Sequence, residues 1–278
     1  MALWHDRHVL ITGGSSGIGL AFGELAAERG AHVTLLARDV GRLEAAREAV
    51  AAARVTEAQR VSAVPADVTS WQSTDAAIRQ AEDLAGPVDV LVTSAGYCHP
   101  ARFVEMPIEQ IEGQVNVDLL GTLHAARAAA PGMVERGRGH IVLLSSMGGI
   151  VGVYGYAPYS AAKFGVMGLA EVLRCELKPH GVGVSVVCPP NVDTPGYARE
   201  REIEPPETAR INGAARTASP RSMAVLVADA IDRRRFVVVP GLGYRLLRRV
   251  KGLVPEIFYA SFDRDVAAAR KEASADVA

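Results

Sequence analysis

The stretch Thr12-Gly-Gly-Ser-Ser-Gly-Ile-Gly19 decides the fold of this chain. It follows the apolar run His8-Val-Leu-Ile-Thr12 and opens a segment, residues 17–29, that has the pattern of a helix ending at Gly30. Glycines between a buried strand and a helix allow a tight turn and a close approach of the backbone to a phosphate, which the helix N-terminus attracts. The stretch therefore predicts a strand–loop–helix unit that binds a dinucleotide pyrophosphate.

The same order, a short apolar strand followed by an alanine-rich helix, recurs along the chain. Strands are predicted at residues 8–12, 32–36, 61–65, 88–93, 141–145, 182–187 and 236–239, and helices at 17–29, from the second strand to about 53, and near 70–85, 108–136, 157–178 and 219–234. Alternation of this kind is typical of a parallel sheet covered on both faces. We therefore expect a single α/β domain over residues 1–278: a Rossmann-like, doubly wound parallel sheet of about seven strands.

Two segments depart from the alternation. Residues 195–218 are charged and punctuated by Pro195, Pro205 and Pro206, and we interpret them as a flap over a site rather than a surface insertion. Residues 233–260 form a basic amphipathic segment, in which seven Arg and Lys residues between 233 and 251 alternate with apolar ones and no acid intervenes. Such a segment can lie on an anionic membrane, and the alternative is a subunit-contact helix whose arginines face water.

Composition narrows the classes of partner. The 278 residues carry 30 Lys+Arg against 31 Asp+Glu, and the resulting net charge of -1 gives no sign of a nucleic-acid partner. Cys98, Cys175 and Cys188 lie far apart, which argues against a disulfide framework and a metal site and fits a reducing cytoplasm. The first residues lack the apolar stretch of an export signal. We expect a cytoplasmic protein without a metal, with peripheral contact at the inner membrane surface left open.

Four polar residues are candidates for catalysis. Tyr159 and Lys163 are four apart at the start of a predicted helix, so they share one face of it. Ser146 follows the fifth predicted strand, and Asn116 lies in a predicted helix. A tyrosine hydroxyl has a pKa near 10, and a neighbouring ammonium lowers that pKa, so the pair Tyr159–Lys163 predicts general acid–base chemistry.

The spacing of the glycine stretch, T-G-x-x-x-G-x-G, together with Tyr-x-x-x-Lys, resembles the short-chain dehydrogenase/reductase family over residues 8 to about 240. The resemblance implies that Ser146 polarises a substrate carbonyl, Tyr159 supplies a proton, Lys163 bonds the nicotinamide ribose, and Asn116 holds a water molecule. The implied dinucleotide contacts are Gly13, Ser15, Ser16, Gly17, Ile18, Gly19, Asp67, Val68, Ser94, Ala95, Gly96, Tyr159, Lys163, Pro189, Val192 and Thr194. Ser94 stands where the family has Asn, and Pro190 where it has Gly.

The form of the cofactor is indicated by charge. An NAD site places an acidic residue at the end of the second strand, where it holds the ribose 2′-hydroxyl. This chain has Arg38 there, and a guanidinium suits a 2′-phosphate, to which Ser15 can add a hydroxyl donor. Asp39 follows immediately and also fits the N-cap of the next helix. We therefore expect NADPH rather than NADH.

Three further stretches narrow the substrate. Residues 159–171, Leu177-Lys-Pro179 and Pro189-Pro-Asn-Val-Asp-Thr-Pro-Gly196 are together similar to the 3-ketodihydrosphingosine reductases within the family, as is Ile257-Phe-Tyr-Ala-Ser-Phe-Asp263. The resemblance implies reduction of the ketone of a long-chain lipid and a homodimer or homotetramer. Two alternatives stay open: a steroid, 3-oxoacyl or other hydrophobic carbonyl or alcohol as substrate, and a catalytically silent dinucleotide-binding sensor.

Overall fold

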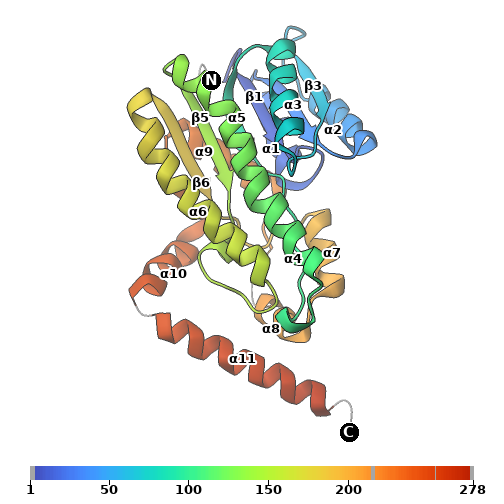
Figure 1. Ribbon diagram of the computed structural model, residues 1–278, viewed down its shortest axis with the longest axis vertical. Coiled ribbons are helices and arrows are strands. Elements are labelled where there is room, and N and C mark those ends of the chain that lie inside the picture. Colours follow the sequence, from blue (N-terminus) through green and yellow to red (C-terminus); the bar gives the residue numbers. More distant parts are fainter. Residues whose placement is uncertain (1–3, 214–216, 254, 276–278) are drawn as a thin grey trace.

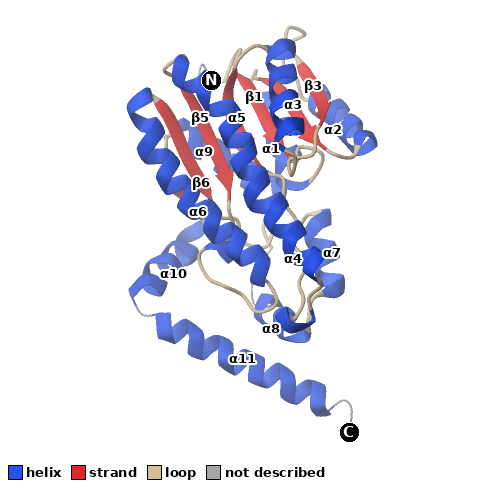
Figure 2. Ribbon diagram, viewed as in Figure 1, coloured by secondary structure: helices blue, strands red, loops and turns tan. Residues whose placement is uncertain are grey.

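A computed structural model describes residues 4–213, 217–253 and 255–275. Its centre is a parallel sheet of seven strands in the order β3-β2-β1-β4-β5-β6-β7 (Figures 1 and 2). The strands are β1 (His8–Thr12), β2 (His32–Ala37), β3 (Val61–Pro65), β4 (Val88–Thr93), β5 (Gly139–Leu144), β6 (Val182–Val187) and β7 (Val237–Val238). The expected α/β class and doubly wound sheet are confirmed. The order reverses between β1 and β4, and ligands bind at such a switch point in open α/β sheets.

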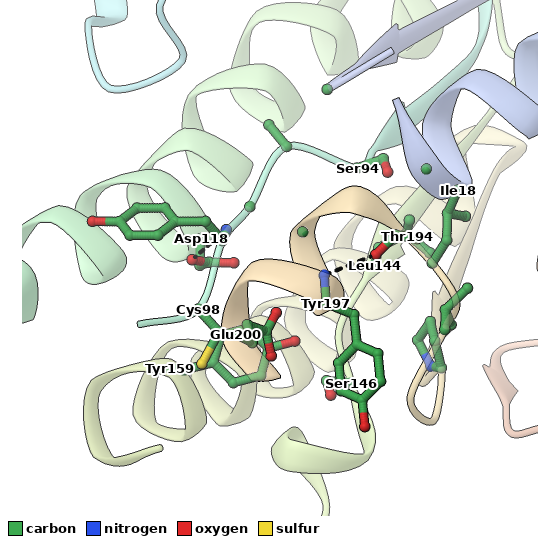
Figure 3. Close-up of a pocket in the computed structure, with 18 of the residues that line it drawn as sticks. Ile18, Ser94, Cys98, Asp118, Leu144, Ser146, Tyr159, Thr194, Tyr197 and Glu200 are labelled. Carbon is green, nitrogen blue, oxygen red and sulfur yellow. Dashed lines mark hydrogen bonds between the residues drawn. The ribbon is translucent and has the colours of Figure 1, made fainter. Parts of the chain in front are cut away.

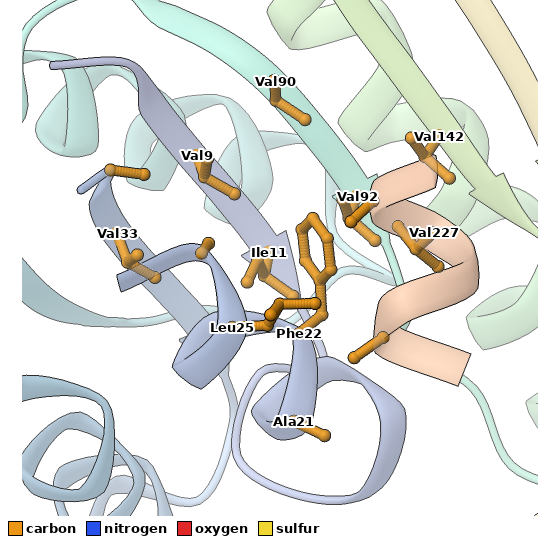
Figure 4. Close-up of a cluster of buried hydrophobic side chains, with 14 of the residues drawn as sticks. Val9, Ile11, Ala21, Phe22, Leu25, Val33, Val90, Val92, Val142 and Val227 are labelled. Carbon is orange, nitrogen blue, oxygen red and sulfur yellow. The ribbon is translucent and has the colours of Figure 1, made fainter. Parts of the chain in front are cut away.

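Helices cover both faces of the sheet, so most residues of the inner strands are buried, whereas only one residue of the edge strand β3 is. One face carries α1 (Gly17–Glu28), α2 (Val40–Ala52) and α9 (Pro220–Asp232). The other carries α3 (Trp71–Ala85), α5 (Gly121–Glu135) and α6 (Ala157–Leu177). Figure 4 shows the first core: Phe22 of α1, fully buried, lies between strand valines and Val227 of α9. The two cores hold the carboxyl ends of the strands at one edge, where the site lies.

The long helix expected near 108–136 is interrupted. It consists of α4 (Ile108–Val115), a π-helical turn (Asn116–Leu120) and α5. A π-helical turn has five residues to a hydrogen-bonded step, so it changes which side chains face the sheet. Buried Asp118 lies within this turn, beneath the loop that follows β4.

The segment predicted as a flap forms two helices, α7 (Pro195–Ile203) and α8 (Pro206–Gly213). Each has proline in its first turn, where the missing N–H has no intrahelical partner to lose. Glu207 of α8 is buried and accepts hydrogen bonds from Arg102 at 3.3 Å and from the Tyr154 hydroxyl at 3.3 Å. These contacts tie α8 to the loops after β4 and β5.

The basic C-terminal segment is also helical. It forms α10 (Gly241–Leu253), and α11 (Pro255–Ala275) follows and packs beside α8, as Figure 1 shows. Arg210 of α8 bonds Glu272 of α11 at 2.6 Å. Over the residues that the structure describes, no helix combines the length and the apolar character needed to cross a bilayer. Strand β7 has only two residues, against the four expected, because it pairs only with Val186 and Val187 at the edge of the sheet.

Candidate active site

A cavity of about 1310 Å³ opens at the carboxyl ends of the strands. Its wall comes from the loops after β1, β2, β4, β5 and β6, from the start of α6, and from α7 and α8 (Figure 3). Sixteen residues predicted from the sequence line it: Gly13, Ser15, Ser16, Gly17, Ile18, Arg38, Val68, Ser94, Ala95, Gly96, Ser146, Tyr159, Lys163, Pro189, Val192 and Thr194. Three residues of the loop after β4 also line it: Tyr97, Cys98 and His99.

The glycine loop is shaped for a close ligand. Gly17 has φ +56, a left-handed conformation that side chains disfavour, and a Cβ on Gly13 would lie 2.6 Å from the backbone of Ala95. The Ser16 side chain makes no capping bond at the start of α1, whereas Asp39 and Ser70 cap α2 and α3. The free N–H groups of α1 therefore point to the cavity, as a pyrophosphate site requires.

The second strand ends at a cationic corner of the same cavity. Arg38 is exposed and lines the cavity, and Arg42, which the sequence analysis did not single out, lines it too. The carboxylate of Asp39 accepts the backbone N–H of Arg42 at 3.0 Å, so it is engaged as the helix cap. The carboxylate of Asp39 is thus used in local structure, and the guanidinium groups of Arg38 and Arg42 line the cavity where the second strand ends.

The catalytic candidates on α6 and after β5 meet as expected. The Lys163 ammonium lies 5.5 Å from the ring centroid of Tyr159, one helical turn away. Ser145 donates its hydroxyl to the Lys163 carbonyl at 2.9 Å, which ties α6 to the end of β5. The next residue, Ser146, is free to face the cavity and interacts with the Tyr159 hydroxyl.

Asp118 is the residue that the sequence analysis missed. Its carboxylate forms an ion pair with Lys163 at 2.9 Å, and both side chains are buried. It also accepts the backbone N–H of Tyr97 at 3.3 Å. Burial raises the pKa of Asp118, and the Lys163 ammonium opposes that rise. The sequence did hold a signal that could have found it: Asp118 is a lone acid among apolar residues, two positions after Asn116.

This ion pair changes the electrostatics expected for Tyr159. The sequence predicted that Lys163 lowers the pKa of Tyr159. In the structure, burial raises that pKa well above its ordinary value, and the negative charge of Asp118 raises it further. The expectation was wrong because burial dominates the pKa of Tyr159 and because Asp118, which is paired with Lys163 at 2.9 Å, adds a negative charge near the hydroxyl. Tyr159 is therefore protonated at neutral pH, the state in which a tyrosine donates a proton.

Three predicted site residues do not line the cavity. Asn116 begins the π-helical turn outside it, so the turn presents Asp118 there instead. The carboxylate of Asp67 folds back onto Thr69, accepting its N–H at 3.0 Å and its hydroxyl at 2.8 Å. Gly19 packs against the loop itself, since a Cβ there would lie 2.5 Å from the carbonyl oxygen of Gly13.

The end of the cavity that is formed by α7 and α8 carries acidic side chains. Glu200 on α7 accepts a hydrogen bond from the Tyr156 hydroxyl at 3.5 Å, and burial raises its pKa to about 7. Burial also raises the pKa of the Cys98 thiol, and the carboxylates of Glu200 and Asp118 raise it further. Asn212 of α8 bonds both the Tyr156 hydroxyl at 2.9 Å and Glu204 at 3.0 Å. Within the described residues, no cluster of His, Cys, Asp and Glu is arranged to hold a metal ion.

The loop after β6 lines the cavity between the glycine loop and α7. Met147 donates its N–H to the Pro189 carbonyl at 2.9 Å, which joins this loop to the loop that carries Ser146. Thr194 caps α7 by accepting the N–H of Tyr197 at 3.1 Å, so its hydroxyl proton is still available to a ligand. Pro190 takes the expected place in the lining despite departing from the glycine of the motif.

Known proteins are similar in sequence to most of this chain. A 3-dehydrosphinganine reductase of Danio rerio is 36% identical over 253 residues, 90% of this chain and 76% of that protein. A 3-ketodihydrosphingosine reductase of Mus musculus is 36% identical over 250 residues, 89% of this chain and 75% of that protein.

Solved structures share the fold. A short chain dehydrogenase/reductase of Burkholderia phymatum in complex with NAD superposes with a TM-score of 0.81 at 26% identity, covering 91% of this chain and 95% of that chain. A short-chain dehydrogenase of Sphingobium yanoikuyae in complex with NADPH superposes with a TM-score of 0.76 at 28% identity, covering 91% of this chain and 95% of that chain. The family model described as short chain dehydrogenase matches residues 7–204. With the glycine loop, Ser146, Tyr159 and Lys163 in place around one cavity, this chain belongs to the short-chain dehydrogenase family and is a nicotinamide-dependent oxidoreductase.

Proposed function

We propose that the protein reduces the 3-keto group of a long-chain 2-amino ketone, 3-ketodihydrosphingosine, with NADPH. The observation that carries the proposal is the similarity to 3-dehydrosphinganine reductases over 90% of the chain. The cavity supports it, since it joins a dinucleotide end to a deep end walled by α7 and α8, with Tyr159 between them. A lipid ketone can enter the deep end while its carbonyl reaches Tyr159.

The roles of the residues follow from their positions. The bound nicotinamide supplies the hydride. Ser146 donates a hydrogen bond to the substrate carbonyl oxygen, and Tyr159, protonated at neutral pH, delivers a proton to that oxygen. Lys163 holds the nicotinamide ribose, Asp118 fixes the lysine in place, and Thr194 bonds the carboxamide. We propose that Asp118, rather than Asn116, is the residue of the π-helical turn that acts on Lys163.

We propose NADPH as the preferred cofactor because of Arg38. Its guanidinium, with that of Arg42, lines the cavity where the second strand ends. A guanidinium forms paired, charge-assisted hydrogen bonds to a phosphate, and a ribose 2′-hydroxyl offers it no negative charge. Ser15 and Ser16, in the glycine loop opposite, can add hydroxyl donors.

The proposal is tested by following NADPH oxidation with 3-ketodihydrosphingosine in detergent micelles, with NADH in parallel. We expect turnover that prefers NADPH and requires the Tyr159 hydroxyl. Binding of NADPH without turnover of this ketone would overturn the substrate assignment. Steroid and 3-oxoacyl ketones would then be the next substrates to assay, and failure on all of them would favour a dinucleotide sensor.

We also propose that the protein meets membranes through α10. This helix exposes Leu242, Leu246 and Leu253 alongside the basic residues Arg245 and Arg249. A lipid substrate makes such contact useful, and it fits a cytoplasmic protein at the inner membrane surface. Co-sedimentation with anionic vesicles at low salt is expected, and loss of binding in the variant Leu242→Ser with Leu246→Ser would place the contact on α10.

We further propose that α7 and α8 form the flap over the substrate. We also propose that the protein assembles as a homodimer or homotetramer.

A further inference from the structure

The substrate proposed above carries a charge next to the bond that reacts. In a 2-amino 3-ketone the amine is attached to the carbon beside the carbonyl carbon. When the carbonyl reaches Tyr159, the ammonium must therefore enter the same cavity, within a few ångströms of the tyrosine. Moving an ammonium from water into a cavity is costly unless an anion or several acceptors meet it there. A carboxylate close to Tyr159 would supply that compensation with a single side chain.

Among the described residues, four carboxylates line the cavity: Asp39, Asp118, Glu200 and Glu202. Asp39 caps α2 at the dinucleotide end, far from the reacting carbon. Asp118 is already paired with Lys163. Glu202 is exposed. Glu200 alone is largely withdrawn from water and unpaired, since none of the described lysines or arginines forms an ion pair with it.

Glu200 also lies on the correct side of the catalytic tyrosine. In Figure 3 it projects from α7 toward Cys98 and Tyr159, below the loop that carries Thr194. The Tyr156 hydroxyl donates to Glu200 at 3.5 Å, and the centroid of the Tyr156 ring lies 5.9 Å from that of Tyr159, so one ring connects the carboxylate with the catalytic tyrosine. The Tyr156 hydroxyl, 3.5 Å away, holds one of its oxygens and leaves the other for a ligand.

A lone carboxylate in this place is costly without a function. Burial and the nearby carboxylates of Asp118 and Glu204 all disfavour its charge, and Arg199, which is exposed, offsets them only in part. An arriving ammonium removes that cost, so the protein and the ligand each supply the charge that the other lacks.

We propose that Glu200 binds the ammonium of an amino ketone substrate and so selects cationic lipid ketones over neutral and anionic ones. The inference rests on the proposed function and extends it to the group beside the reacting carbon. It predicts that 3-oxoacyl thioesters are poorer substrates, because the groups beside their reacting carbonyl are neutral and leave the Glu200 carboxylate without a cation. A neutral ketone of the same chain length still binds through its apolar part.

The test compares Glu200→Gln with the unaltered protein on two ketones in identical micelles, 3-ketodihydrosphingosine and octadecan-3-one, which has the same chain and lacks the 2-amine and the 1-hydroxyl; each ketone is compared between the two proteins. Glutamine keeps the size and shape of the side chain, removes its charge and replaces one acceptor oxygen with a donor NH2 group, which cannot accept from an ammonium. Because charge-assisted hydrogen bonds of this kind contribute about 1.5–3 kcal/mol, we expect KM for the amino ketone to rise about 10- to 100-fold. KM for octadecan-3-one should stay the same, which also shows that the variant is folded.

Two further variants sharpen the result. Glu200→Asp keeps a carboxylate and is expected to retain most of the preference for the amino ketone. Glu176→Gln removes one negative charge from the exposed end of α6, outside the cavity, and is expected to change neither KM.

The outcomes separate the two proposals. If the unaltered protein reduces the amino ketone but Glu200→Gln raises KM for both ketones equally, or for neither, the inference about Glu200 is wrong and the proposed function stands. If the unaltered protein binds NADPH and reduces neither ketone, the proposed function fails and the inference falls with it.

Discussion

The two ends of the cavity are built in different ways. The dinucleotide end is made of continuous strand–loop–helix segments, such as β1 with its glycine loop and α1, so neighbours in sequence are neighbours in space. The substrate end gathers Cys98, Tyr156, Glu200 and Asn212 from four separate segments. The first end binds a ligand common to the family, and the second must fit a particular substrate. Local sequence pattern therefore describes the first end well, and only the folded chain describes the second.

Tyr159 lies where the two ends meet, and Tyr159→Phe should have the largest effect. Removing the hydroxyl removes the proton donor, and general acid catalysis contributes about 10²- to 10⁴-fold, so kcat should fall by that factor. NADPH affinity should change little. Single-turnover assays and NADPH fluorescence measure the two quantities. The matched variant Tyr156→Phe removes a hydroxyl that bonds Asn212 and Glu200 and should lose far less. Comparable losses in the two variants would contradict the assignment.

A break confined to the dinucleotide end is expected from Arg38→Asp. The substitution removes a charge-assisted contact to the 2′-phosphate and adds a repelling carboxylate. Because one such contact contributes about 1.5–3 kcal/mol, NADPH affinity should fall about 10- to 100-fold while NADH affinity is unchanged or higher. Titration of both cofactors measures this. Arg79→Asp, on the exposed face of α3, is the control for a general change of charge. Equal NADPH affinity in Arg38→Asp and the control would make the cofactor proposal wrong.

The contrast between the two ends also explains what the sequence could predict. The sheet, the glycine loop and the trio Ser146, Tyr159 and Lys163 follow from spacing on regular elements, and the structure brings them together. Asp118 could not be predicted by helical spacing, because the π-helical turn rotates the chain between Asn116 and Leu120. Glu200 could not be predicted either, since one acid among the charges of residues 195–218 becomes distinctive only when α7 folds over the cavity. Both misses are carboxylates whose environment is set by distant segments.

Asp118 lies between the two ends of the cavity, and its effect on Tyr159 can be tested by measuring how activity depends on pH. Its charge raises the pKa of Tyr159, so Asp118→Asn should lower that pKa. Ketone reduction requires protonated Tyr159, and activity is lost as pH rises through its pKa. The alkaline loss of kcat/KM should therefore begin at a lower pH in Asp118→Asn than in the unaltered protein, with a smaller effect at neutral pH than that of Arg38→Asp. A pH–rate profile measures it. Asn116→Ala, outside the cavity, should leave the profile unchanged, and a shift there instead would restore the original assignment.

The smallest expected effect concerns the substrate end alone. Burial raises the pKa of Glu200 to about 7, and the groups that face it are Tyr156, Cys98, Asp118, Glu204 and Arg199. Below this pKa the carboxyl is protonated and cannot pair with an ammonium; above it the carboxylate forms. KM for the amino ketone should therefore fall by up to about tenfold from pH 6 to pH 8, the change in carboxylate fraction that a pKa near 7 implies.

Steady-state kinetics across this range separate Glu200 from every other titrating group. The neutral octadecan-3-one passes through the same cavity and meets the same Tyr159, so any pH dependence that it shares with the amino ketone belongs to catalysis or to the dinucleotide end. The part specific to the amine should disappear in Glu200→Gln. If that part persisted in the variant, the titrating group would be the amine of the substrate itself, and the acidity of the substrate end would then have no role in selecting the ligand.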